Sequence, residues 1–354
     1  MDRIERIKAA LSDWKGGAML ITSPVNRLFA TGFASSAGVL LISARGAWFF
    51  IDSRYEEAAK AVISGAQVCL VTRERPYADQ LNAVIKEEGI TTVGFEDGAV
   101  TYSEYLDWKE KLETELAPMQ KLLTQLRSVK TEDELSWMIR AQRIAEKSFE
   151  DILSLINTDI TEKELAAELV RRLLKNGADD RSFDPIVVSG DRSSLPHGAP
   201  GDSKIGRGFL TIDFGAKLGG WCSDTTRTLC VGKPTDEMIK VYDTVLEAQT
   251  VGIRAARSGV SGRDIDAAAR AVIEKAGFGA FFGHGFGHGL GLEIHEPPNA
   301  SPTYGGVIPA GAVISAEPGI YLPGRFGVRI EDVIRITESG CENITNLKKE
   351  LIIL

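Results

Sequence analysis

The sequence is poor in cysteine and in histidine. It has four residues of each type among 354. The cysteines form no CxxC pair, and they lie far apart in the chain at Cys69, Cys222, Cys230 and Cys341. We therefore expect free thiols in a reducing cytosol, with no disulfide framework.

Long apolar runs are also absent. No stretch approaches the ~18 consecutive apolar residues that a membrane-spanning helix needs. The N-terminal segment lacks the uninterrupted apolar run of a signal peptide. Apolar residues at helical spacing predict an amphipathic surface helix there instead: Ile4, Ile7, Leu11 and Trp14. We expect a cytoplasmic protein.

Acidic residues outnumber basic residues. With 41 basic and 49 acidic residues, the formal net charge is −8. An acidic surface does not attract nucleic acid or acidic membranes, so neither is an expected partner.

Two common hydrolase motifs are missing. HExxH is absent because Pro297 and Pro298 follow His295-Glu296, and GxSxG does not occur. This excludes a zincin and a serine-hydrolase elbow. The glycine-rich segment 281–298, FFGHGFGHGLGLEIHEPP, could resemble a nucleotide loop, but its histidines and the lack of a following helix cap argue against that function.

The pattern along the chain predicts an α/β protein with two domains. Residues 1–122 alternate strand-like and helix-like runs, which indicates a mixed α/β domain with a parallel or mixed sheet. No nucleophile motif or phosphate loop occurs there, so this domain is expected to be a scaffold, a lid or a dimer partner. The second domain is predicted over residues 123–354.

The second domain contains an internal repeat. Capping boxes at Thr131 and Thr161 predict two helices, and a hairpin follows over residues 208–231. Two further helices, after Thr235 and over about 262–276, precede a second hairpin over 311–336. Such halves can pack about a pseudo-two-fold axis with one site between them.

Each predicted hairpin carries two acids. A tight turn at 218–219 would place Asp213 opposite Asp224, and a turn centred on the Pro-Gly glycine would place Glu317 opposite Glu331. Opposed acids repel one another unless protons or cations compensate their charge. Surface acids are the alternative, but the flanking residues are those of buried strands.

All four histidines fall in the stretch that contains or separates these acids: His197, His284, His288 and His295. His284 and His288 are four residues apart and share a face in a strand or a helix. The glycines between them would let the backbone approach a ligand or metal. Four acids with these imidazoles predict a hydrolase with two divalent metals.

The motifs SSLPHG, LTIDFG, CSDTTRT, GHGFGHGLGLEIHE, SAEPGIY and GVRIED resemble those of the creatinase/prolidase family of metallopeptidases. The resemblance extends over nearly the whole chain and includes IDSRY and LRSVKTEDEL. It implies a creatinase-like N-terminal domain, a pita-bread catalytic domain and a homodimer.

The resemblance also implies roles for particular residues. Asp213 would bind one metal, Asp224 and Glu331 would bridge both, and His288 with Glu317 would complete the second. His197, His284 and His295 correspond to substrate-binding histidines outside the metal shell, and Arg329 to an arginine near a ligand acid. Oxygen-rich ligation suits Mn²⁺, with Co²⁺ or Zn²⁺ as alternatives.

The predicted reaction is hydrolysis of an N-terminal Xaa-Pro bond by a hydroxide that bridges the metals. Glu317 would pass a proton to the leaving nitrogen, and His197 or His295 would stabilise the oxyanion. An Xaa-Pro aminopeptidase is preferred over an Xaa-Pro dipeptidase because no insertion looks long enough to close the site. A metal-free binding module is a third alternative.

Overall fold

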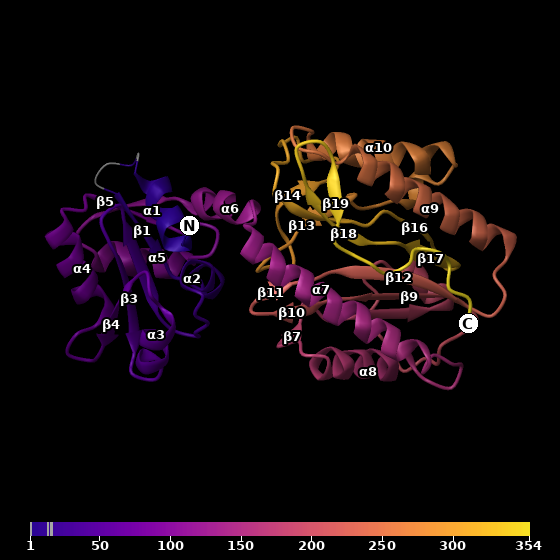
Figure 1. The fold of residues 1–354 in the computed structure, drawn as a ribbon, viewed down its shortest axis with the longest axis horizontal. Helices are drawn as coiled ribbons and strands as arrows, with labels where there is room; N and C mark the ends of the chain where they lie inside the picture. Colours follow the sequence, from indigo (N-terminus) through magenta and orange to yellow (C-terminus); the bar gives the residue numbers. More distant parts are fainter. Residues whose placement is uncertain (1, 13, 15–16) are drawn as a thin grey trace. The chain divides into compact units, whose positions relative to one another are not determined.

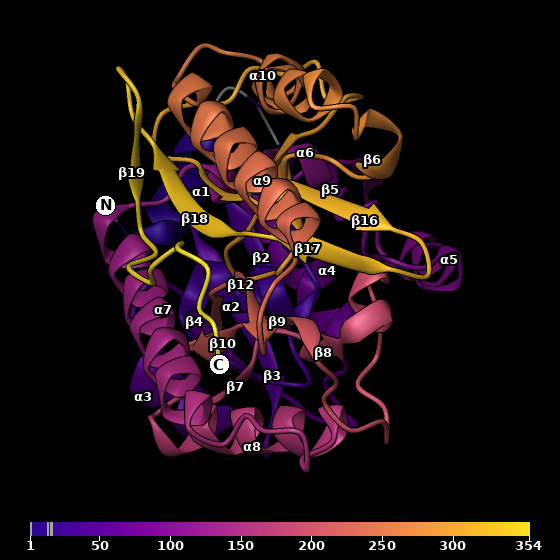
Figure 2. The same ribbon diagram turned by 90° about the vertical axis from the view of Figure 1, so that its right-hand side faces the viewer.

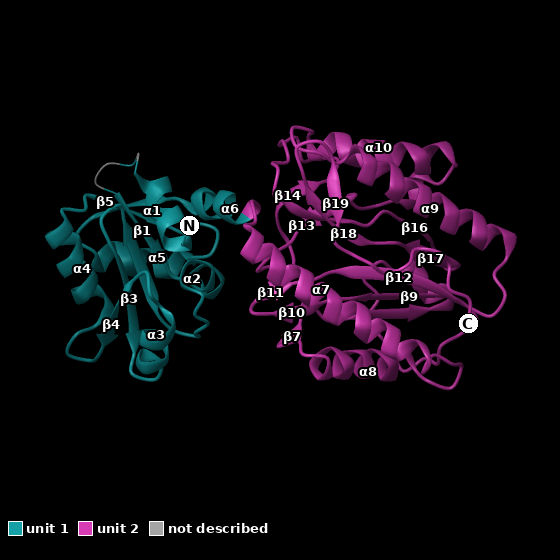
Figure 3. Cartoon of the chain, in the orientation of Figure 1, with its two compact units in different colours: residues 1–127 teal, residues 128–354 magenta. Residues whose placement is uncertain are grey.

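The structure is a computed structural model that describes residues 2–12, 14 and 17–354. The chain divides into two compact units, Met1–Arg127 and Ser128–Leu354 (Figures 1 and 3). The boundary expected from the sequence, between residues 122 and 123, falls within helix α6 (Gln120–Ser128).

The first unit contains a six-stranded mixed sheet in the order β4-β3-β2-β1-β5-β6. Its strands are β1 (Gly17–Ile21), β2 (Val39–Ser43), β3 (Ala47–Asp52), β4 (Gln67–Val71), β5 (Thr92–Phe95) and β6 (Glu115–Pro118). Its other helices are α1 (Arg3–Leu11), α2 (Pro24–Thr31), α3 (Glu56–Val62), α4 (Tyr77–Glu88) and α5 (Tyr102–Lys111). The predicted mixed α/β architecture is confirmed.

The four long helices of the second unit begin where the sequence predicts. They are α7 (Glu132–Leu153), α8 (Glu162–Lys175), α9 (Asp236–Ala255) and α10 (Gly262–Lys275). Thr131 and Thr161 each form a complete capping box, and Thr235 caps α9 through its side chain. These caps satisfy backbone N–H groups that the helices cannot pair internally.

The strands of the second unit form two similar halves. The first half contains β7 (Asp180–Arg181), β8 (Ile186–Ser189), β9 (Gly208–Phe214), β10 (Ala216–Leu218), β11 (Trp221–Cys222) and β12 (Thr225–Val231). The second contains β13 (Gly287–Gly289), β14 (Glu296–Ala300), β15 (Val313–Ala316), β16 (Gly319–Leu322), β17 (Phe326–Arg329), β18 (Asp332–Ile336) and β19 (Cys341–Asn343).

Each half has its own apolar core. Side chains of α7 and α8 pack on β8, β9 and β12, while those of α9 and α10 pack on β15 to β18. Figure 1 shows α9 and α10 on one side of the strands and α7 and α8 on the other. Figure 2 shows α9 lying across β16 and β17. The predicted repeat of helix pair and hairpin is confirmed.

The register of the first hairpin differs from the prediction by two residues. Asp213 of β9 lies opposite Thr226 of β12, so Asp224 is a diagonal neighbour of Asp213. The cause is the turn, in which Gly219 and Gly220 both have positive φ and form the two-residue loop. Because side chains alternate with a period of two, a two-residue shift leaves both acids on one face.

The register of the second hairpin agrees with the prediction. Gly319 pairs with Arg329 in the β16–β17 ladder, and Ala316 pairs with Asp332 in the β15–β18 ladder. These two ladders have one common register, which places Glu317 level with Glu331 between them. In the part of the chain that the structure describes, no helix has the length and apolar composition of a membrane span.

Candidate metal centre

A cavity of about 640 Å³ lies between the two halves of the second unit. Its walls include every site residue expected from the sequence: His197, Asp213, Asp224, His284, His288, His295, Glu317, Arg329 and Glu331. Residues from segments far apart in the chain therefore meet in one place, as the repeat predicts.

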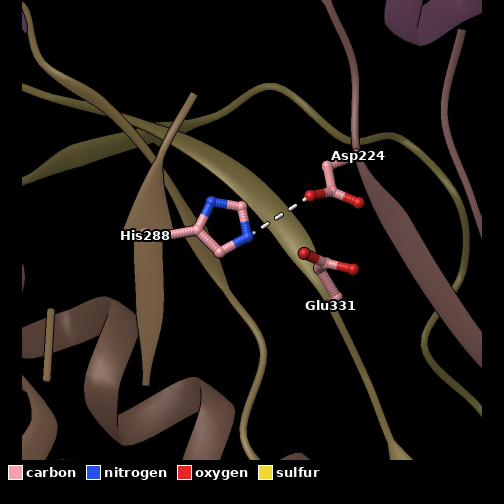
Figure 4. Close-up of side chains that lie close together, drawn as sticks. All are labelled: Asp224, His288 and Glu331. Carbon is pink, nitrogen blue, oxygen red and sulfur yellow. Dashed lines mark ion pairs between the residues drawn. The ribbon is translucent and has the colours of Figure 1, made fainter. Parts of the chain in front are cut away.

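Three of these residues form the centre of the cluster. Single ligand atoms of Asp224, His288 and Glu331 all lie within 4.8 Å of one another (Figure 4). Asp224 directly precedes β12, His288 lies on β13, and Glu331 lies between β17 and β18. Nε2 of His288 is 3.5 Å from Oδ2 of Asp224. This geometry suits one cation shared by three side chains.

Glu317 is the next carboxylate in the cluster. Its Oε1 is 3.3 Å from Nε2 of His288 and accepts a 3.0 Å hydrogen bond from the Ser315 hydroxyl. The Glu317 amide donates to the carbonyl of Phe286 over 2.7 Å. Glu317 is thus fixed against the strand that carries His288.

Asp213 is held by a guanidinium. Nη2 of Arg329 donates to Oδ2 of Asp213 over 2.7 Å, and Nε of Arg329 donates to the Thr226 hydroxyl over 3.0 Å. That hydroxyl donates in turn to Oε2 of Glu331 over 2.7 Å. One arginine therefore orients two carboxylates, one directly and one through Thr226.

The remaining oxygens of these two acids provide the test of whether a metal fits. Oδ1 of Asp213 and Oε1 of Glu331 are buried and have no hydrogen-bond partner among the described residues. Buried polar atoms are nearly always paired, so each unpaired oxygen requires a partner. A divalent cation would supply that partner for both, and the donor set fits one.

Burial and mutual repulsion change the acidity of the cluster. Burial, followed by the charge of Glu331, raises the pKa of Asp224 well above its ordinary value. Burial and then Glu317 do the same to the pKa of Glu331, and burial also raises the pKa of Glu317. Without a cation, the cluster therefore binds protons more tightly than free carboxylates do.

Burial favours the neutral form of three of the four imidazoles. Burial lowers the pKa of His288, and burial also lowers the pKa of His284 and His295. A neutral imidazole has a free lone pair, which a metal ligand needs. The ring of His295 lies edge-on to that of His288 with centroids 4.3 Å apart.

His197 and His295 are both exposed at the cavity, whereas His284 is partly buried. Nε2 of His284 lies 2.9 Å from the Tyr321 hydroxyl, which also accepts a 2.7 Å hydrogen bond from Nη1 of Arg329. Burial raises the pKa of Tyr321 to about 12, so its hydroxyl stays protonated.

The structure shows features around the site that the sequence does not specify. Phe286 lies between His284 and His288 in the chain, yet it is fully buried in the core and its ring packs on Gly252. A Cβ on Gly287 would collide with the Ser315 carbonyl, so this glycine admits a neighbouring strand rather than a metal. Thr226 could have been noted in CSDTTRT, but nothing in that motif specifies its bond to Glu331.

Two family models match the chain. Residues 136–338 match metallopeptidase family M24, and residues 3–129 match the creatinase/prolidase N-terminal domain. Together they cover nearly all of the sequence, and the first model alone covers more than half.

Solved structures and sequence relatives also point to this family. The Xaa-Pro dipeptidase of Bacillus anthracis is 42% identical with a TM-score of 0.95, covering 100% of this chain and 99% of that one. The X-Pro aminopeptidase of Thermotoga maritima is 35% identical with a TM-score of 0.91, covering 96% and 97%. The Xaa-Pro dipeptidase of Pyrococcus furiosus is 34% identical, covering 99% of both. The chain belongs to the M24 family of metallopeptidases, and it has the pita-bread fold and the creatinase-like N-terminal domain that its sequence predicts.

Proposed function

We propose that the protein is a metal-dependent Xaa-Pro dipeptidase. The observation that carries this proposal is the carboxylate–imidazole cluster at the wall of the cavity, where one oxygen of Asp213 and one of Glu331 are buried with no hydrogen-bond partner among the described residues. The dipeptide substrate is supported by the similarity to the dipeptidases of Bacillus anthracis and Pyrococcus furiosus. The sequence alone favours the aminopeptidase, whereas the comparisons give the dipeptidase more support.

An Xaa-Pro aminopeptidase is the second candidate function. The similarity to the Thermotoga maritima enzyme favours it, because that alignment also covers both chains almost completely. The two activities share their chemistry and differ in whether a chain beyond proline is accepted.

Five residues would hold two divalent ions, with Mn²⁺ as the proposed metal: Asp213, Asp224, His288, Glu317 and Glu331. Four carboxylates and one imidazole form an oxygen-rich set that suits a hard cation. When bound, the metals supply a water molecule of lowered pKa as the nucleophile and polarise the substrate carbonyl.

The protein side chains would supply the remaining steps. Glu317 would take a proton at its carboxylate and deliver it to the proline nitrogen as the peptide bond breaks. His197 or His295 would donate a hydrogen bond to the carbonyl oxygen as charge develops there. Arg329 would keep the Asp213 carboxylate oriented, since it donates to that carboxylate directly.

The shape of the cavity also suits proline. Pro185, Ile186, Pro196 and Ile294 contribute apolar surface to its walls. Proline has no amide N–H in a peptide bond and has a fixed backbone angle, so a shaped apolar wall can recognise it without a hydrogen bond. We also propose that the protein is a homodimer, which sedimentation equilibrium would test.

The experiment compares Ala-Pro with Ala-Pro-Ala-Ala, each with added Mn²⁺ and with a chelator. Cleavage of Ala-Pro alone, lost on chelation, is the expected result. Cleavage of both peptides would establish the aminopeptidase instead. If neither is cleaved with Mn²⁺, Co²⁺ or Zn²⁺, the proposed function is wrong.

A further inference from the structure

Two buried carboxylates outside the cavity hold the loops that carry two of its histidines. Glu162 of α8 is 0% exposed and Asp266 of α10 is 1% exposed. Neither residue lines the cavity. A carboxylate is rarely buried unless it is paired and hydrogen-bonded, so the partners of these two side chains indicate what they do.

Glu162 closes the loop that contains His197. Its Oε1 accepts a 2.8 Å hydrogen bond from the amide of Ser189, which ends β8. Its Oε2 accepts a 3.1 Å bond from the amide of Gly201, beyond the histidine. One side chain therefore fixes both ends of the segment 189–201, whose middle reaches the cavity.

Arg192 adds contacts nearer the middle of the loop, and we call Glu162 with Arg192 the first clamp. Its Nε donates to Oε2 of Glu162 over 3.0 Å, and its Nη2 donates to the carbonyl of Ala199 over 2.6 Å. From the cavity side, Nη1 of Arg329 donates to the Pro196 carbonyl over 3.2 Å. The backbone on both sides of His197 is thus held by guanidinium groups.

Asp266 and Arg270 hold the loop of His284 in a similar way. Oδ1 of Asp266 accepts a 2.9 Å hydrogen bond from the amide of Phe286. Arg270 bonds both oxygens of Asp266, over 2.8 and 3.0 Å, and donates to the carbonyls of Phe282 over 2.9 Å and His284 over 2.7 Å. The main chain is therefore fixed on both sides of His284.

Helix capping does not account for these contacts. Glu162 lies at the first position of α8 and Asp266 lies within α10, yet both accept hydrogen bonds from amides of distant loops. In both halves of the unit, a helix supplies the acid and an arginine adds bonds to loop carbonyls. The two loops differ in sequence, so the evidence for each arrangement comes from its own hydrogen bonds.

We propose that Glu162 with Arg192, and Asp266 with Arg270, are positioning residues that set His197 and His284 against the substrate. The expected loss of turnover rests on the proposed function. The expected displacement of the loops rests only on the contacts described above. A catalytic group displaced by about 1 Å can cost about 100-fold in rate. Loosening either loop should therefore lower activity without removing metal.

The test uses Glu162→Gln and Asp266→Asn in the full chain. Because the chain has four histidines, histidine-selective labelling gives one ring signal for each, assigned with His197→Gln and His284→Gln. Spectra are recorded with added zinc, which is diamagnetic. We expect Glu162→Gln to move the His197 signal alone and Asp266→Asn to move the His284 signal alone. Both variants should lower kcat/KM for Ala-Pro about 10-fold to 100-fold, with unchanged metal content.

The matched control is Glu168→Gln on the same helix as Glu162. Glu168 bonds Arg171 and Arg172 over 2.6 to 2.7 Å and lies outside both loops, so its loss should move none of the four signals. If Glu162→Gln does not fold, Arg192→Met replaces it, since Arg192 is partly exposed.

Unchanged histidine signals in the clamp variants, or an equal shift of all four, would overturn the inference. An inactive wild type with the expected selective shifts would leave the clamps in place and refute the proposed function instead. The two proposals can therefore fail separately.

Discussion

Arg329 and Asp213 form a buried ion pair at the wall of the cavity, with Nη2 and Oδ2 2.7 Å apart. Burial opposes the charge on Arg329, but Tyr321 and Asp213 raise its pKa well above its ordinary value. The guanidinium therefore stays charged. It orients Asp213, whose other oxygen has no hydrogen-bond partner among the described residues. Arg329 therefore belongs to the proposed metal centre because it orients a ligand, although it is not a ligand itself.

Replacing Arg329 should weaken metal binding. In Arg329→Met, Asp213 loses its partner, and loss of such an orienting contact costs about 10-fold to 100-fold in metal affinity or activity. Isothermal titration with Mn²⁺ measures the affinity. Arg325→Met is the control, because Arg325 lies on the same hairpin but forms an exposed pair with Glu237. Equal affinities in the two variants would contradict this role.

Asp224→Asn should abolish both metal binding and activity while the fold survives. Asp224 lies in the three-residue cluster, and the neutral amide relieves the repulsion that raises the pKa of the carboxyl group. Metal analysis of the purified variant and its circular dichroism spectrum provide the measurement. A variant with wild-type turnover would refute the assignment of Asp224 as a metal ligand.

The stability of the metal-free protein should depend on pH in an unusual direction. The pKa values of Asp224 and Glu331 are raised above 3.8 and 4.5, so the folded state binds protons more tightly than the unfolded state. The free energy of unfolding should therefore fall as pH rises from about 4 through the raised values.

Thermal unfolding from pH 4 to pH 8 tests this dependence, with Asp224→Asn as the comparison. We expect the Tm of the metal-free wild type to fall relative to that of the variant as pH rises, and Mn²⁺ to restore it at neutral pH. Parallel Tm profiles for the two proteins would show that repulsion among the carboxylates does not destabilise the metal-free protein.

Tyr321→Phe should impair catalysis and leave the metal content unchanged. The Tyr321 hydroxyl connects Nη1 of Arg329 with Nε2 of His284, and its removal leaves both groups without that partner. A catalytic group misplaced by about 1 Å can cost about 100-fold in rate, and a smaller displacement of His284 should cost less. A loss of roughly tenfold in kcat/KM is expected, and an unchanged value would exclude a role for this link.

The sequence predicted the hairpins well because their turns have clear local signals. The Pro-Gly turn fixed the register that places Glu317 level with Glu331. The Gly219-Gly220 pair allowed two registers, and the structure has the one shifted from the prediction. The error left the site intact because side-chain direction depends on even or odd spacing alone.

What the sequence could not predict depends on tertiary contacts. Glu162 and Asp266 look like ordinary helix acids, and only their buried contacts with distant amides distinguish them. Phe286 lies between two histidines, yet its ring points into the core against Gly252. Periodicity and motif spacing do not specify such long-range pairings.

Titration of the metal-free protein with Mn²⁺, while Ala-Pro hydrolysis is followed, tests the proposed two-metal site directly. We expect no hydrolysis without metal and full activity at two Mn²⁺ ions per chain. Full turnover in the presence of a chelator would contradict this expectation.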